Sequence, residues 1–185
     1  MILTRNLKIP AWDDSAAEVA VEYWRGRGFN ELSVETGPRL AGRRGSELGS
    51  WFPIRWFRTA NLWELDWRKC ETSVVMVPDG PGEVRVELEA FLGPRPRRYT
   101  GWGRAFLRLE VAELNHLLCG GEPLVDVWTR FVADSRSATT MMAWTKGLMK
   151  RPFPEEWDVE IEELELRFLF PSKPGSASPD VLGSK

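Results

Sequence analysis

The feature that most constrains the fold is a strict alternation of side chains between residues 84 and 90. Apolar and charged residues alternate there, in the order Val84, Arg85, Val86, Glu87, Leu88, Glu89, Ala90. A period of two is typical of a strand with one face in the core and the other in water. Turn residues at 78–82 and a strand-like apolar run at 72–77 come before it. We therefore predict an antiparallel hairpin with one buried face.

A long amphipathic helix is predicted from about residue 101 to residue 119. Leu107, Val111, Leu114 and Leu118 fall on one helical stripe, and two glycines end the helix. We expect this stripe to face the apolar residues of the hairpin across a shared core.

The remaining segments complete an α+β prediction. Strands are expected at 2–9, 31–36 and 39–44, and helices at 15–26, 123–132 and 138–148. The first helix carries a capping box, Ser15 with Glu18. Together these predict a curved antiparallel sheet of about five to six strands packed on the long helix, with a mostly helical C-terminal appendage.

Residues 154–170 fit two structures. Trp157, Ile161, Leu164 and Phe168 have helical spacing, but the same segment fits a strand with one bulge. Because Phe, Val and Ile dominate its apolar residues, the strand is preferred.

Composition indicates a single domain over residues 1–170 and a disordered tail over 171–185. The net charge of -2 gives no general attraction to nucleic acid or anionic lipid. The N-terminus does not resemble a signal peptide, and no window is apolar enough to span a membrane. Cys70 and Cys119 form no C-x-x-C pair, so free buried thiols and a cytoplasmic location are expected.

Tryptophan is the one outlier in composition, with 10 residues, of which four lie between residues 51 and 67. Arginines are interleaved with them, and a further basic loop covers residues 93–98. Packing between sheet and helix is the simplest account of these tryptophans. A protein partner, a ligand cavity and nucleic acid follow in that order. If they bind a partner, the predicted contact residues are Trp51, Trp56, Arg58, Arg97 and Arg98.

An anion site is a second possibility, at Arg43, Arg44, Gly45 and Ser46. Successive main-chain N–H groups beside guanidinium groups can hold phosphate or carboxylate. The segment is neither a Walker A loop nor a dinucleotide-binding motif. A tight turn that uses the glycine for positive φ is the favoured alternative.

No catalytic or metal signature is present, and no cofactor is predicted. His116 is the only histidine, and it is expected on a helix surface or as a hydrogen-bonded core residue. Glu87 and Glu89 share one strand face, but a solvated charged stripe explains them better than a carboxylate pair.

Two resemblances accompany these patterns. The order of elements resembles the helix-grip arrangement of apolar-ligand carriers, which implies a cavity between sheet and helix. The segment from Arg43 to Phe52, with its Arg-Gly-Ser turn and following Leu-Gly, resembles an uncharacterised bacterial domain with an antiparallel hairpin and a closing helix. That likeness covers roughly residues 30–119 and implies no activity.

The sequence thus predicts a non-catalytic binding or protein-interaction module that uses a Trp/Arg-rich surface. A protein partner or a homo-oligomer is expected. The alternatives are a carrier or enzyme with an apolar small-molecule cavity and, after it, nucleic-acid or anion binding.

Overall fold

The computed structural model describes residues 1–30, 32–34, 39–46, 54–56, 63–65, 67–91, 97–139 and 153–169. Its main sheet is antiparallel throughout, in the order β1-β7-β6-β3-β2. The strands are β1 (Ile2–Lys8), β2 (Ser33–Val34), β3 (Leu40–Arg44), β6 (Thr72–Gly80) and β7 (Glu83–Ala90). A separate two-stranded sheet pairs β4 (Ile54–Trp56) with β5 (Trp63–Leu65), and a short 3-10 helix, η1, covers Trp67–Lys69.

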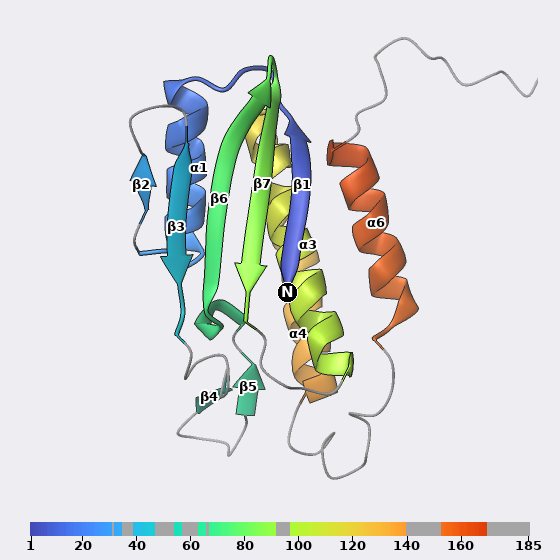
Figure 1. Cartoon of the computed structure of the whole chain (residues 1–185). Helices are drawn as coiled ribbons and strands as arrows, with labels where there is room; N and C mark the ends of the chain where they lie inside the picture. Colours follow the sequence, from blue (N-terminus) through green and yellow to red (C-terminus); the bar gives the residue numbers. More distant parts are fainter. Residues whose placement is uncertain are drawn as a thin grey trace, which may run out of the picture.

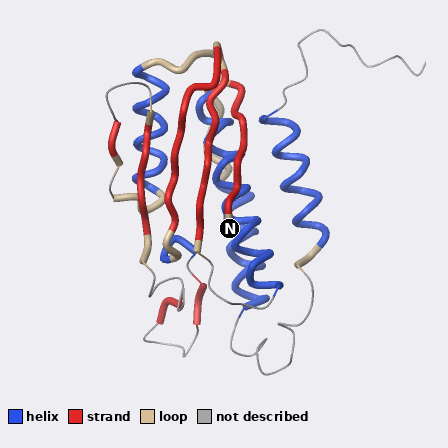
Figure 2. The backbone as a smooth tube through the Cα atoms, in the orientation of Figure 1, coloured by secondary structure: helices blue, strands red, loops and turns tan. Residues whose placement is uncertain are grey.

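Four α-helices accompany the sheet in the described part of the chain: α1 (Asp14–Gly26), α3 (Arg97–Leu118), α4 (Val125–Thr139) and α6 (Glu155–Leu169). Figure 1 shows α1 and α3 behind the sheet, α4 beside α3, and α6 next to the edge strand β1. Figure 2 shows the same layering, with the strands in front of the helices. The predicted α+β class is confirmed. None of the described helices is long and apolar enough to cross a membrane.

The β6–β7 hairpin provides the centre of the core. In β7, Val84, Val86 and Leu88 are fully buried, whereas the charged residues between them are exposed, as the alternation predicts. They share one core cluster with Leu107, Val111 and Leu114 of α3. Burying each such side chain contributes roughly 1.5–3 kcal/mol, so the contacts between hairpin and helix stabilise the fold.

The preference for a strand at residues 154–170 is wrong, because the segment forms the helix α6. Trp157, Ile161, Glu165 and Leu169 are its buried residues, four apart along the chain. Its Leu and Glu residues are good helix formers. The first turn also holds Glu155, Glu156 and Asp158, whose charges favour the positive end of a helix dipole. The β-branched and aromatic residues carried less weight than this periodicity.

Several other predicted features differ from the structure. The N-cap of α1 is Asp13, whose Oδ1 accepts a hydrogen bond from the Ala16 N–H at 2.9 Å, in place of the predicted Ser15 box. Arg97 and Arg98 begin α3 and do not belong to a loop. Cys119 is exposed, against expectation, whereas Cys70 is buried, and the two cysteines form no disulfide. Residues 140–148 and the predicted tail at 171–185 lie outside the described residues.

Several tryptophans fill the core. Trp24 and Trp102 are fully buried and Trp157 nearly so, with edge-on aromatic neighbours such as Phe29 and Phe131. Core packing is therefore the right account for these three. These three tryptophans belong to α1, α3 and α6.

Candidate functional site

The end of β3 brings together the four residues of the predicted anion site, but their side chains diverge. Arg43 is exposed, whereas Arg44 is buried and directed into the core. Gly45 has φ +72°, and a Cβ there would lie 2.2 Å from the main-chain oxygen of Cys70. The Ser46 N–H donates to the Lys69 carbonyl at 3.2 Å. Gly45 is thus required because two chain segments touch at this position. The anion site stays a prediction, and of its two arginines Arg43 is the exposed one.

Arg44 forms a bidentate ion pair with Glu110 of α3 in the interior. The two N–O distances are 2.5 and 2.7 Å, and both side chains are fully buried. The guanidinium also lies 4.6 Å from the Phe29 ring centroid and 5.4 Å from that of Phe106. Parallel N–H donors matched to two carboxylate oxygens make this the strongest geometry available to such a pair. Arg44 therefore fastens the end of β3 to α3.

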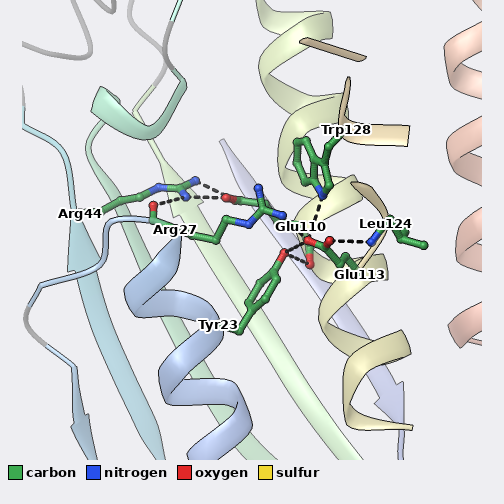
Figure 3. Close-up of polar contacts among 7 residues, drawn as sticks. All are labelled: Tyr23, Arg27, Arg44, Glu110, Glu113, Leu124 and Trp128. Carbon is green, nitrogen blue, oxygen red and sulfur yellow. Dashed lines mark hydrogen bonds and ion pairs between the residues drawn. The ribbon is translucent and has the colours of Figure 1, made fainter. Parts of the chain in front are cut away.

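Glu113, one helical turn further on, receives four donors (Figure 3). Its Oε1 accepts the Leu124 N–H at 3.0 Å, and its Oε2 accepts the Trp128 indole N–H at 2.9 Å. Arg27 forms an ion pair with the same oxygen, and the Tyr23 hydroxyl lies 3.0 Å from it. Glu113 thus ties α1 and the start of α4 to α3.

We call these six side chains the core network: Tyr23, Arg27, Arg44, Glu110, Glu113 and Trp128. Its two arginines balance its two glutamates, and every carboxylate oxygen has a donor. Burial raises the pKa of Tyr23 well above its usual value; the charges of Glu110 and Glu113 add to the rise and Arg27 opposes it. The Nε–H of Arg44, by contrast, is buried without a hydrogen-bond partner in the described part of the chain. The contacts of the network join β3, α1 and the start of α4 to α3.

A hollow of about 320 Å³ opens at one end of the sheet, where β3 and β7 finish and β6 starts. It is lined by Met1, Arg43, Glu71, Thr72, Ser73, Glu89, Ala90 and Phe91. The strand register places Ile2, Glu89, Ser73 and Arg43 in one row across four strands. This row lies on the exposed face of the sheet, opposite the core.

The residues that line the hollow include both charged and apolar side chains. Arg43 and Glu89 are exposed and lie two strands apart, which is about 10 Å. Phe91 is 42% exposed at the rim. Because the hollow is on the outer face and carries ionic groups, it gives no support to an apolar-ligand cavity between sheet and helix.

The predicted partner-binding residues lie toward this same end as far as the structure describes them. Trp56 is in β4, with Trp63 of β5 opposite it in the register. Arg97 and Arg98 are the first two residues of α3. Figure 1 shows β4 and β5 beyond the end of the main sheet, at the end of the molecule where α3 also starts, and β5 lies against α4. Trp51 and Arg58 lie outside the described residues.

The remaining candidate residues are His116, Glu87 and Glu89. His116 is half-buried and stacks on Phe168, with 4.2 Å between ring centroids. Glu87 and Glu89 are exposed on the outer sheet face, as predicted. Among the described residues no group of three or more His, Cys, Asp or Glu could hold a metal ion.

Sequence reasoning missed the core network. One signal was available: Glu110 and Glu113 stand one turn apart among Leu109, Val111 and Leu114, and all five are buried. Acidic residues amid apolar ones on both sides of a helix indicate that the helix is enclosed and its carboxylates paired. The partners could not be found, because Tyr23, Arg27 and Arg44 are far away in the chain.

Comparison of the chain with protein-family models, with curated proteins and with solved structures found no match. The function must therefore be argued from the geometry above.

Proposed function

We propose that this protein is a non-catalytic binding module whose contact surface is the end of the molecule that carries β4, β5 and the start of α3. One observation carries the proposal: the register of the β4–β5 sheet sets Trp56 opposite Trp63 and Arg55 opposite Glu64. Opposite residues in an antiparallel pair are direct neighbours across the two strands, so the register makes these two tryptophan positions adjacent. Tryptophan and arginine are the residue types most often found at the centre of protein interfaces.

The surroundings of this small sheet support the same reading. The hollow beside Arg43 and Glu89 offers room for a partner's side chain, with a cation and a carboxylate for hydrogen bonds. Arg97 and Arg98 add two positive charges at the start of α3. Among the described residues, the buried glutamates Glu110 and Glu113 belong to the core network and the third, Glu165, is paired with two arginines, so each is committed to an ion pair within the protein.

The test is partner recovery with single substitutions. Trp56→Ala and Arg58→Ala, each made in the full chain, should lose most of the partner captured by the parent protein while keeping its circular dichroism spectrum. Trp12→Ala is the control, because Trp12 belongs to the segment between β1 and α1, which Figure 1 shows at the opposite end of the sheet; Trp12 is partly buried against the core, so its variant also shows the effect of losing a packed tryptophan. If the two variants fold and retain every partner, the proposal fails.

The alternatives make different predictions for the same material. Nucleic-acid binding requires an affinity that falls steeply with salt. A small-molecule carrier requires a compound that co-purifies with the native protein and shows in its mass spectrum. Either result, with partner capture unaffected by Trp56→Ala, would replace the proposed function.

A further inference from the structure

The helix α6 divides its acidic residues into two groups. Three of its seven acids bind arginines of neighbouring elements. Glu165 pairs with Arg5 of β1 at 3.0 Å and with Arg108 of α3 at 2.7 Å. Asp158 also binds Arg108, at 3.2 Å, and Glu160 pairs with Arg130 of α4. Glu165 lies in the buried row of the helix, and together these contacts hold α6 against the body.

The other four acids, Glu155, Glu156, Glu162 and Glu163, are exposed. Among the described residues none of the four makes a hydrogen bond or an ion pair. Val159 and Leu166 lie between them, seven residues apart, and each is 54% exposed. At 3.6 residues per turn these six positions form one face, opposite the buried residues Trp157 and Ile161. We call it the outward face of α6.

Solvated carboxylates alone would need no explanation. The pair Val159 and Leu166 is what distinguishes this face, because both apolar side chains stand in its centre and not at its margin. A spacing of seven brings two side chains to the same line on a helix, which is the spacing that a second helix contacts. The glutamates flank this line on both sides, where the edges of such a contact carry complementary charge.

We propose that the outward face of α6 is a docking site for a cationic amphipathic helix of a partner protein. The partner's apolar residues pack on Val159 and Leu166, and its lysines or arginines lie against the four glutamates. Nucleic acid and anionic lipid surfaces are repelled by these charges. Two copies of this face would also repel each other, since each brings four carboxylates to the contact, so a symmetric α6–α6 dimer is disfavoured.

The proposal is independent of the proposed function, because α6 and the β4–β5 sheet lie in different parts of the molecule (Figure 1). A partner could use both surfaces, but neither argument requires the other. Binding at α6 should survive Trp56→Ala unchanged.

The experiment measures the affinity of synthetic helical peptides for the full chain by fluorescence anisotropy. The first peptide has leucines seven apart flanked by lysines. The second has glutamates in place of these lysines, and the third has the composition of the first in an order that is not amphipathic. We expect the first peptide to bind at least about tenfold more tightly than the other two, with an affinity that falls as salt is added.

Variants of α6 then locate the site. Val159→Gln with Leu166→Gln should weaken the first peptide by about tenfold while leaving the fold intact, since both side chains are exposed. Glu162→Lys with Glu163→Lys should lose the first peptide and gain the second, which a nonspecific effect would not produce. The control is Glu83→Lys with Glu87→Lys in β7, which makes the same charge change away from α6 and should leave the affinity unchanged.

Three results would overturn the proposal. Equal binding of the first and third peptides would mean that charge alone attracts them. An equal loss of affinity in the control variant and in the α6 variant would mean that the site is not on α6. A dimer in sedimentation that dissociates on Val159→Gln with Leu166→Gln would assign this face to a second copy of the chain.

Discussion

The core network and the outward face of α6 use the same kinds of residue in opposite ways. In the core, Glu110 and Glu113 are buried, balanced by two arginines and saturated with donors. On α6, four glutamates are exposed without an ion-pair partner in the described part of the chain, and they surround exposed apolar side chains. A buried carboxylate whose hydrogen bonds are made within the protein stabilises the fold. An exposed carboxylate without such bonds is available to bind a partner.

The comparison predicts its largest effect at Glu110. Glu110→Gln leaves the Arg44 charge buried without a counterion, which should lower the free energy of unfolding by about 3–5 kcal/mol. Urea unfolding monitored by tryptophan fluorescence measures this. Glu87→Gln on the outer sheet face is the control and should change stability by less than about 0.5 kcal/mol. Equal losses of unfolding free energy in Glu110→Gln and Glu87→Gln would contradict the proposed difference between buried and exposed glutamates.

A smaller and more local effect is expected at Glu113. Glu113→Gln replaces one carboxylate oxygen by an amide NH₂, so one of the donors from Arg27, Trp128 or Leu124 faces another donor. The cost should be about 1–3 kcal/mol. Because Glu113 holds the start of α4, amide hydrogen exchange should accelerate at Leu124 and in the first turn of α4. Unchanged exchange there would mean that Glu113 does not anchor this helix.

The dependence of the free energy of unfolding on alkaline pH should reflect the ionisation of Tyr23. Its pKa is raised in the folded protein, mainly by burial, so above about pH 10 the unfolded chain releases this proton first. The free energy of unfolding should therefore fall as the pH rises from there toward the folded pKa. Ultraviolet titration of a Tyr99→Phe background isolates Tyr23. A normal tyrosine titration in the folded protein would contradict the enclosed network.

The smallest effect is expected on α6. Glu162→Gln with Glu163→Gln should alter the free energy of unfolding by no more than about 0.5 kcal/mol, because neither carboxylate has an ion-pair partner among the residues that the structure describes. A slight gain would reflect reduced repulsion among the acids of α6. Thermal unfolding followed by circular dichroism is sufficient. A loss beyond about 1 kcal/mol would show that these glutamates hold the fold and would count against a recognition role.

The periodicity of apolar residues predicted those elements whose buried face is set by their own sequence. The alternation in β7 and the leucine stripe of α3 are of this kind, because the period of the sequence fixes which face is buried. Prediction failed at α6, where helix and strand patterns overlap and the helix formers and favourable end charges decided the outcome. The location of the N-cap at Asp13 was missed for a similar reason, since several residues near it can cap.

The site was less predictable than the fold. The sequence placed Arg44 in a predicted anion site. In the structure Arg44 is paired with Glu110, which lies 66 residues away in the chain. Neither a motif nor a spacing encodes a contact of that range, which depends on how β3 packs over α3. The exposed character of Glu87 and Glu89 followed from alternation alone, because their neighbours in the strand had to be buried.

The most direct test of this account is a double-mutant cycle between Arg44 and Glu110, measured by urea unfolding of the parent chain, Arg44→Met, Glu110→Leu and the double variant. If the two charges are committed to each other, each single variant should lose several kcal/mol, and the double variant should recover about 2–3 kcal/mol of the summed loss. Losses that add within about 0.5 kcal/mol would contradict the core network.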